Sequence, residues 1–435
     1  MPFAGLDLPI RQRAGHVIQQ KRSDKKRGAQ YTLDKNVGRF IKISGTNEGD
    51  IMKVWRLAGK TAGRAGLVAA LSAALSAAGI GCAHAQSSVT LYGIISTGIE
   101  YVSNVKGSHL FALANGGMMP PRFGLRGDED LGGGTHAIFT LENGFSITNG
   151  AMLGGMFGRQ AYVGLSNQRY GTVTMGRQYE EMTNSLWWAE SANIFAGFGA
   201  HIGDNDNMFF TNRFNNSVRY VSPTLSGLTF AGSYAFSNST QFSNNNGFSG
   251  SANYASGPLK AGVAFTQFNR RSNANPSNLT SGAVDSTGWG FSSPFVVSPT
   301  GAGTDQQRIL GAGASYDFGF VNVLVSYSNV LFNYSDSSGL RLQNGELGVW
   351  KRFTPAFQVG VSYVYTAADY SGGRSPHYNQ VTLATDYLLS KRTDLFLTGI
   401  YQRASGPGAY AQIYTTTASS GSTQALVQAG IRHRF

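Results

Sequence analysis

The chain has 435 residues, of which 41% are hydrophobic and only 13% are charged. Soluble globular proteins usually carry about 25% charged residues, and a helical membrane protein would contain apolar runs of roughly 18 residues or more. No such run occurs between residues 86 and 435. The composition therefore argues against both classes, although a large secreted β-sandwich or β-helix stays open on composition alone.

The formal net charge of +12 is distributed unevenly along the chain. Residues 1–85 contain 14 basic and five acidic residues, so the remaining 350 residues carry a net charge of only +3. The high pI of 9.7 therefore belongs mainly to the N-terminal segment. It gives no reason to expect binding to nucleic acid.

Residues 1–51 are polar and basic, and we interpret them as an upstream extension of the reading frame, with Met52 as the true start. A genuine long leader is the alternative. Residues 52–85 predict a secretory signal peptide, because a basic start is followed by an apolar stretch at 67–78 and by the small-x-small site Ala83-His84-Ala85. This stretch is too short for a membrane anchor.

The single cysteine, Cys82, also lies in the predicted leader, so residues 86–435 offer neither a disulfide nor a thiol nucleophile. A lipoprotein signal is the alternative for Cys82. The sequence before it, Gly79-Ile80-Gly81, lacks the leucine usual three residues ahead of a lipidated cysteine, which weakens that interpretation.

From Gln86 onward, segments of about ten residues alternate between apolar and polar side chains and are separated by Gly, Asn, Ser, Asp and Pro. This pattern predicts about sixteen antiparallel strands. The predicted strands begin near Val89, Arg122, Thr135, Phe157, Thr172, Arg213, Leu228, Phe248, Leu259, Gln307, Phe320, Leu340, Ala356, His377, Thr393 and Gln424.

The predicted connections alternate in length. Short turns fall at 256–258, 317–320, 353–356 and 389–392, and longer segments rich in Asn, Ser and Gly fall at 237–247, 270–306 and 404–422. Short turns at one rim and long loops at the other are typical of the periplasmic and extracellular ends of a transmembrane β-barrel. Tyrosines and phenylalanines near strand ends, Tyr92 among them, are expected to form interfacial girdles.

The last thirteen residues, Thr423 to Phe435, alternate between a largely apolar face and a largely polar one. An arginine facing lipid at the bilayer midplane would cost about 2–4 kcal/mol, so the charged face must point inward. Pairing of the strand at Val89 with the strand ending at Phe435 would leave no open sheet edge in lipid. We therefore predict an all-β, transmembrane antiparallel β-barrel over residues 86–435, wide enough to hold water.

The chain resembles the Gram-negative general porins of the neisserial and burkholderial type. The resemblance is carried by Ser88 to Gly93 (SVTLYG), Arg122 to Gly132 (RFGLRGDEDLG), Phe157 to Leu165 (FGRQAYVGL), Gly171 to Gln178 (GTVTMGRQ), Asn215 to Tyr220 (NNSVRY) and Gly430 to Phe435 (GIRHRF). It implies a homotrimer of sixteen-stranded barrels in the outer membrane, in contact with outer-membrane lipid and lipopolysaccharide. It also implies that Phe435 is a C-terminal assembly signal.

The resemblance further implies that a third loop, at about 179–212, folds inward and constricts the pore. The acidic side of this constriction would consist of Glu180, Glu181, Glu190, Asp204 and Asp206. Its basic wall would come from the arginines on the flanking strands, which are Arg122, Arg126, Arg159, Arg177, Arg213 and Arg219. Of these, Arg122, Arg159 and Arg213 match the basic wall of related porins by motif. Acids facing arginines would set up a field across the pore that orients solutes. Because the arginines slightly outnumber the acids, we expect a preference for anions. The alternative for each residue is an ordinary turn cap or rim ion pair.

The sequence offers little for catalysis or cofactor binding. The five histidines after residue 86 are widely separated and lack metal-ligand spacing, and no nucleotide-binding or hydrolase motif is present. We expect no enzyme activity, cofactor, metal or nucleic-acid partner, although Ser, His and Asn from neighbouring strands could still assemble a hydrolase site. The favoured function is a passive, water-filled channel for ions and small hydrophilic solutes. The alternative is a barrel-anchored surface protein whose long loops bind a partner.

Overall fold

The computed structural model describes residues 87–240, 242–269, 283–284 and 293–435. The expected extension at 1–51 and signal peptide at 52–85 lie outside the described residues. Within the described residues, the helical elements fall between β7 and β8: α3 (Glu181–Leu186), η1 (Trp187–Ala189), η2 (Ala192–Ala196), η3 (Gly197–Gly199) and η4 (Ile202–Asp204). None of the helices in the described residues is long and apolar enough to cross a membrane.

The strands form one antiparallel sheet. They are β1 (Ser88–Val105), β2 (Ser108–Asn115), β3 (Arg122–Asp130), β4 (Thr135–Phe145), β5 (Met152–Leu153), β6 (Gln160–Asn167), β7 (Gly171–Gln178), β8 (Phe214–Val221), β9 (Leu228–Ala235), β10 (Gly247–Ser256), β11 (Leu259–Asn269), β12 (Thr304–Asp317), β13 (Asn322–Tyr334), β14 (Gly339–Arg352), β15 (Phe357–Tyr370), β16 (His377–Leu388), β17 (Thr393–Ser405) and β18 (Thr423–Arg434).

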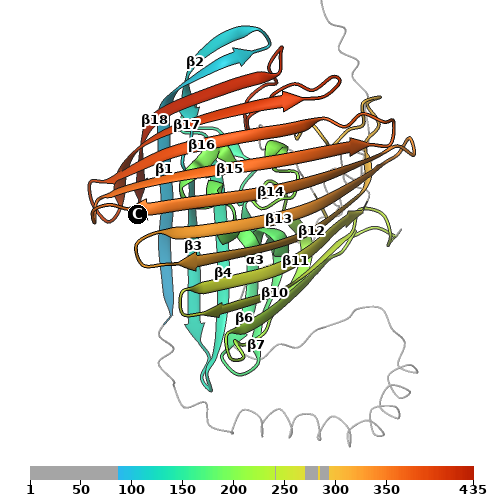
Figure 1. Cartoon of the computed structure of the whole chain (residues 1–435). Coiled ribbons are helices and arrows are strands. Elements are labelled where there is room, and N and C mark those ends of the chain that lie inside the picture. The colour runs from blue at the N-terminus through green and yellow to red at the C-terminus, as the bar shows by residue number, and fades with distance from the viewer. Residues whose placement is uncertain (1–86, 241, 270–282, 285–292) are drawn as a thin grey trace, which may run out of the picture. The chain divides into compact units, whose positions relative to one another are not determined.

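The sheet closes on itself, because β1 pairs with β18 as well as with the strands that follow it. The long β1 pairs with β3 along its first half and with β2 along its second half. In the same way, β4 pairs with both β6 and the two-residue β5. β2 and β3 thus share one position around the barrel, as do β5 and β6, so the structure is a closed sixteen-strand antiparallel β-barrel (Figure 1).

The strand prediction from sequence is confirmed in number and position. Each of the sixteen predicted starts lies within three residues of a strand start in the structure. The predicted alternation of connection lengths holds less strictly, because only 335–338 separate β13 from β14 at the rim where long loops were expected. The prediction also missed β2, the second strand of a hairpin that extends β1 past its neighbours.

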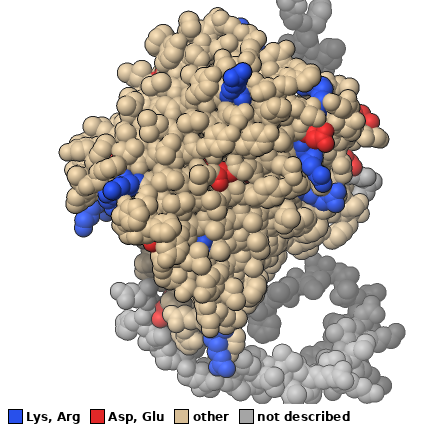
Figure 2. Space-filling model, in the orientation of Figure 1, with Lys and Arg blue, Asp and Glu red and all other residues tan. Residues whose placement is uncertain are grey.

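The two faces of the sheet differ as the alternation predicts. On β16, Val381 and Leu383 are about half exposed on the outside, whereas Thr382 and Ala384 are buried on the inside. Figure 2 shows that few charged side chains interrupt the middle of the visible outer face. Exposed apolar side chains around a closed barrel lower the free energy when hydrocarbon, and not water, covers them.

The C-terminal residue takes part in closing the barrel. The Phe435 backbone N–H donates to the Gly93 carbonyl at 3.1 Å, and the Gly93 N–H donates to the Phe435 carbonyl at 3.0 Å. A side chain on Gly93 would collide with the Phe435 ring, because a Cβ there would lie 2.4 Å from ring atom Cζ. The glycine therefore leaves room for the terminal ring at the first and last strands.

Candidate functional site

The connection between β7 and β8, residues 179–213, holds the five acidic residues singled out in the sequence. Nearly all of its side chains are buried, and Trp187 is the exposed exception. Its polar groups bond to side chains on the inner face of the barrel, from β8 to β16. Figure 1 shows α3 and the short helices between the near and far strands. We call residues 179–213 the inner loop.

The first anchor of the inner loop is Glu180, which caps α3. Its carboxylate accepts hydrogen bonds from the backbone N–H groups of Met182 at 2.6 Å and Thr183 at 3.0 Å, as N-cap residues do. The Thr266 hydroxyl on β11 and the Asn207 side-chain amide also donate to it. Burial raises the pKa of Glu180 to about 7, although these donors oppose that shift.

The next residue, Glu181, ties the inner loop to β8. Arg219 donates from Nε to Oε1 at 2.7 Å and from Nη2 to Oε2 at 3.0 Å, which is a bidentate pair. Glu181 is fully buried and Arg219 is largely covered. The Glu181 backbone N–H donates to the Ser249 hydroxyl on β10. This pair joins one predicted acid to one predicted arginine.

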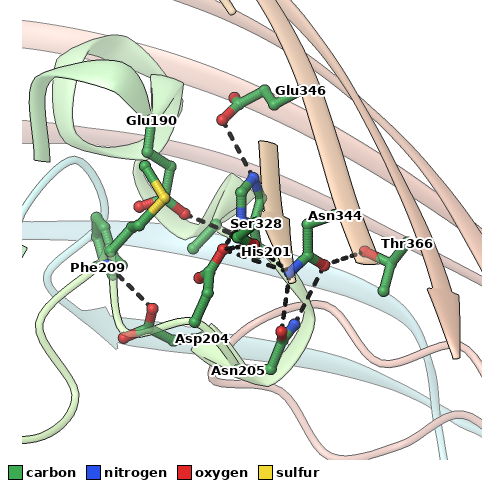
Figure 3. Close-up of polar contacts among 12 residues, drawn as sticks. Glu190, His201, Asp204, Asn205, Phe209, Ser328, Asn344, Glu346 and Thr366 are labelled. Atoms are coloured by element: carbon green, nitrogen blue, oxygen red, sulfur yellow. Dashed lines mark hydrogen bonds and ion pairs between the residues drawn. The ribbon is translucent and has the colours of Figure 1, made fainter. Parts of the chain in front are cut away.

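The deepest anchor is centred on His201, whose side chain is fully buried between two carboxylates (Figure 3). Nδ1 lies 2.7 Å from an oxygen of Asp206, and Nε2 lies 3.2 Å from an oxygen of Glu346 on β14. The His201 backbone N–H donates to Glu190 at 3.1 Å. With an acid at each ring nitrogen, the arrangement fits a doubly protonated, positively charged imidazole.

Further bonds connect this cluster to three strands of the wall. Asp206 accepts from the Ser328 hydroxyl on β13 and from the Asn344 amide on β14 at 3.3 Å. Asn344 also accepts from the Thr366 hydroxyl on β15 at 2.7 Å. Glu346 accepts from the hydroxyl and the backbone N–H of Ser191 in the inner loop. The inner loop is thus held to β13 and β14 by polar side chains within one buried patch, and β15 joins the patch through Asn344.

The cluster perturbs the acid-base equilibria of its loop members in opposite directions. Burial would lower the pKa of His201, but Asp206, Glu346 and Glu190 together raise it well above its usual value. Burial would raise the pKa of Asp206, but the His201 charge lowers it below its usual range. Burial raises the pKa of Glu190 well above its normal value. The buried charge therefore sits mainly on His201 and Asp206 among these loop residues.

Asp204 shapes the turn that follows. Its two carboxylate oxygens accept from the backbone N–H groups of Phe209 and Thr211, each at 2.9 Å. Burial, followed by the neighbouring charge of Asp206, raises the pKa of Asp204 to about 6. The carboxylate thus satisfies backbone donors within the inner loop itself.

Glycines on the inner faces of the strands make room for the loop. A Cβ at Gly360 on β15 would lie 2.4 Å from Cδ2 of Phe195, and one at Gly313 on β12 would lie 2.3 Å from the Ala189 Cβ. The Phe195 ring also packs against Trp350, with 6.0 Å between ring centroids. These contacts place apolar loop residues directly on the strand backbone.

Three of the six predicted arginines gather around two aromatic rings, Tyr179 at the start of the inner loop and Phe210 near its end. The guanidinium groups of Arg122 and Arg159 lie 5.5 and 5.2 Å from the Phe210 ring centroid. The guanidinium of Arg213 lies 5.0 Å from the Tyr179 ring centroid. Cations at such distances from a ring face are attracted by its quadrupole. We call Arg122, Arg159 and Arg213 the arginine cluster.

A carboxylate on the wall accompanies the arginine cluster. Glu142 on β4 accepts from Arg159 Nε at 2.6 Å and from the Tyr92 hydroxyl at 2.9 Å. Tyr92 was expected in a lipid-facing girdle, and that expectation is wrong, because its hydroxyl points inward to Glu142. Arg213 donates to the Thr211 carbonyl at 2.8 Å and to the Tyr179 hydroxyl at 3.2 Å. The cluster is therefore held in place by both the wall and the loop.

A cavity of about 340 Å³ borders this cluster. Arg159 and Arg213 line it together with Phe210, Tyr414 and Glu100. A solute in this space would meet two cationic side chains, one carboxyl group and aromatic side chains.

The other three predicted arginines have partners of their own. Arg126 lies 4.9 Å from the Tyr92 ring centroid, and Arg177 donates to the Gly158 carbonyl at 2.7 Å and to the Asn215 side chain. Arg219 pairs with Glu181, as described above. The predicted basic wall therefore consists of one group of three arginines around the two rings and three arginines held by other partners.

Sequence reasoning missed several residues of this site. Neither Glu142 nor His201 was predicted to belong to this site. Two features of the sequence could have indicated them. Glu142 lies on the polar face of its strand, and His201 lies in an acidic segment. In the described part of the chain, no group of three His, Cys, Asp or Glu side chains is arranged to hold a metal ion.

Comparisons with known proteins agree on one family. A sequence model of Gram-negative porins matches residues 69–407. An outer membrane porin of Bordetella pertussis is 32% identical over 420 residues, covering 84% of this chain and 99% of the relative. Outer membrane porin protein 32 of Delftia acidovorans is 31% identical, covering 82% and 96%. The solved anion-selective porin from Comamonas acidovorans is 25% identical with a TM-score of 0.63, covering 80% and 100%.

Proposed function

Because the chain belongs to the Gram-negative porin family, we propose that this outer-membrane β-barrel is a passive, water-filled channel for ions and small hydrophilic solutes. The proposal includes assembly as a homotrimer, which the resemblance of the sequence implies. The channel needs no catalytic group or cofactor. Transport follows the solute gradient through the barrel.

We further propose that the inner loop narrows this channel and that the arginine cluster forms one side of the narrow zone. The observation that carries this proposal is the position of Arg159 and Arg213 beside both the inner loop and the 340 Å³ cavity. Charged side chains at a constriction act strongly on passing ions, because little water is present to screen them. The polar anchors at Glu180, Glu181 and His201 supply the rigidity that a constriction needs.

The cluster favours anions in this proposal. Three guanidinium groups lie near two carboxylates, Glu142 and the cavity-lining Glu100, so the local excess of charge is positive. The anion-selective porin from Comamonas acidovorans shares 25% identity over a barrel of the same fold, which supports the same direction of selectivity.

Single-channel recording in planar bilayers tests the channel proposal. Purified protein should give ohmic current steps, often grouped in threes, and a reversal potential of the anion-selective sign across a salt gradient. Replacement of an arginine of the cluster by alanine should make that reversal potential smaller. Replacement of Arg169, an exposed arginine in a turn between β6 and β7, is the matched control. A protein that inserts but passes no current would overturn the proposal and favour a surface anchor with partner-binding loops.

We also propose that translation starts at Met52 and that cleavage after Ala85 releases residues 86–435. Mass spectrometry of the precursor and of the membrane-inserted protein tests both points. A peptide from residues 1–51 recovered from cells would contradict the proposed start.

A further inference from the structure

A second cavity, of about 520 Å³, lies away from the arginine cluster, near the rim with short turns. Trp187 and Trp188 of η1 and Trp350 of β14 line it. Three of the five tryptophans in the chain are therefore gathered around one space. This cavity is distinct from the one beside the arginine cluster, with which it shares no lining residue.

These indole rings face the inside of the barrel. Trp350 is on the same face of β14 as Asn344 and Glu346, which bond to the inner loop. Lipid cannot reach this face, so the membrane gives no reason for tryptophan here. Trp350 packs against Phe195 and Trp188 packs against the buried core, but Trp187 is 46% exposed. Apolar surface left in water costs about 25 cal/mol per Å², so packing alone leaves Trp187 unexplained.

The same cavity carries one positive and one negative side chain, Lys260 on β11 and Asp317 at the end of β12. Lys260 is the register partner of Ser315, so Asp317 is its diagonal neighbour across the strand pair. Diagonal neighbours are separated by roughly 7–8 Å. Within the described residues the two side chains form no ion pair, and Asp317 accepts the Gly319 backbone N–H at 2.7 Å.

We propose that this cavity is a transit subsite for aromatic amino acids, an inference that rests on the proposed channel function and specifies one solute class for it. The ring of the solute stacks on Trp187 against Trp188 and Trp350. Its carboxylate lies toward the Lys260 ammonium, and its ammonium lies toward the Asp317 carboxylate. A cation and an anion held apart beside an aromatic wall complement a zwitterion with a planar ring better than they complement a simple anion.

The test is the current noise and block that L-phenylalanine causes when added at the short-turn side of the reconstituted full-length channel. L-phenylalanine should act at lower concentration than L-leucine, which lacks the ring. Two analogues that lack one charge each, 3-phenylpropionate and phenethylamine, should act about two- to fivefold more weakly, as exposed charge pairs allow. Trp187→Ala should weaken the phenylalanine effect about three- to tenfold.

Lys260→Gln should weaken phenylalanine and 3-phenylpropionate but not phenethylamine. Controls are Tyr170→Ala and Lys391→Gln, an exposed aromatic and an exposed lysine in other turns. Equal action of phenylalanine and leucine, or an unchanged Trp187→Ala channel, would overturn the subsite. Full potency of 3-phenylpropionate would overturn the amino-acid assignment in favour of a plain aromatic carboxylate. Normal salt currents with no phenylalanine effect would refute the subsite alone, whereas absent salt currents would refute the channel itself.

Discussion

Replacement of His201 by Ala should release the middle of the inner loop from the wall. The imidazole lies 2.7 Å from Asp206 and 3.2 Å from Glu346, and all three side chains are fully buried. Removing one partner of a buried ion pair costs about 3–5 kcal/mol, because the other charge stays in a medium of low polarity. Ser328 and Ser191 still donate to the two carboxylates, so we take the lower bound. About 3 kcal/mol raises the population of the released loop roughly 100-fold.

A thiol reporter measures that population. Residues 86–435 contain no cysteine, so Ala192→Cys in the inner loop, 1% exposed, gives a single buried thiol once Cys82 is replaced by Ser. Its labelling by a water-soluble maleimide should rise roughly 100-fold with His201→Ala. His136→Ala is the matched control, because His136 also lies 2.7 Å from an aspartate, Asp128, but both are exposed. A labelling rate in the His201 variant no higher than in this control would refute the reasoning.

Four further results are expected. Arg122→Ala or Arg159→Ala should lower the preference for anions, measured as a smaller reversal potential across a salt gradient. Deleting part of 185–205 should raise single-channel conductance, and unchanged conductance would mean that the inner loop does not constrict the channel. Gly360→Leu should displace Phe195 and destabilise the loop by about 1–3 kcal/mol, as overpacking does, seen as faster thiol labelling. In the wild type, labelling measured relative to an exposed cysteine at the same pH, which cancels the pH dependence of thiolate formation, should also speed up on both sides of neutral pH. Because the pKa of His201 is raised, its protonation stabilises the bound loop at low pH, and this contribution is lost as pH rises through that pKa. Because the pKa of Asp206 is lowered, its ionisation stabilises the bound loop at higher pH, and this contribution is lost as pH falls through that pKa. The alkaline increase should be absent from His201→Ala.

The strands could be predicted because a barrel wall imposes a local rule. Each residue either faces outward or inward, and a period of two follows directly from the pleat. On β18, Leu426, Gln428 and Arg432 are buried inside while Val427 and Ile431 are exposed outside, as the alternation in the sequence indicates. β2 escaped prediction because it follows β1 in a tight hairpin at Lys106-Gly107, within a stretch too short to separate two strands by composition.

The inner loop obeys no such local rule. Its acids were predicted to face the arginines, but sequence spacing does not say which buried group meets which. His201 and Glu346 are 145 positions apart, and Glu180 and Thr266 are 86 apart. Only the barrel brings them together. The arginine cluster was predictable in part, because Arg122, Arg159 and Arg213 match motifs of related proteins, whereas the pairing of Arg159 with Glu142 depends on the register of neighbouring strands.

The loop acids also change the reason for expecting anion preference. A count of six arginines against five acids treats every acid as a full charge at the pore. In the structure, burial raises the pKa of Glu180 to about 7 and that of Asp204 to about 6. At neutral pH a larger fraction of each group is therefore uncharged than in an ordinary carboxyl group. Glu181 is matched by Arg219. Loop acids that are partly uncharged or paired with an arginine cancel little of the positive charge of the arginine cluster. The field that a passing ion meets beside this cluster then depends chiefly on its three guanidinium groups, on Glu142 and on the cavity-lining Glu100.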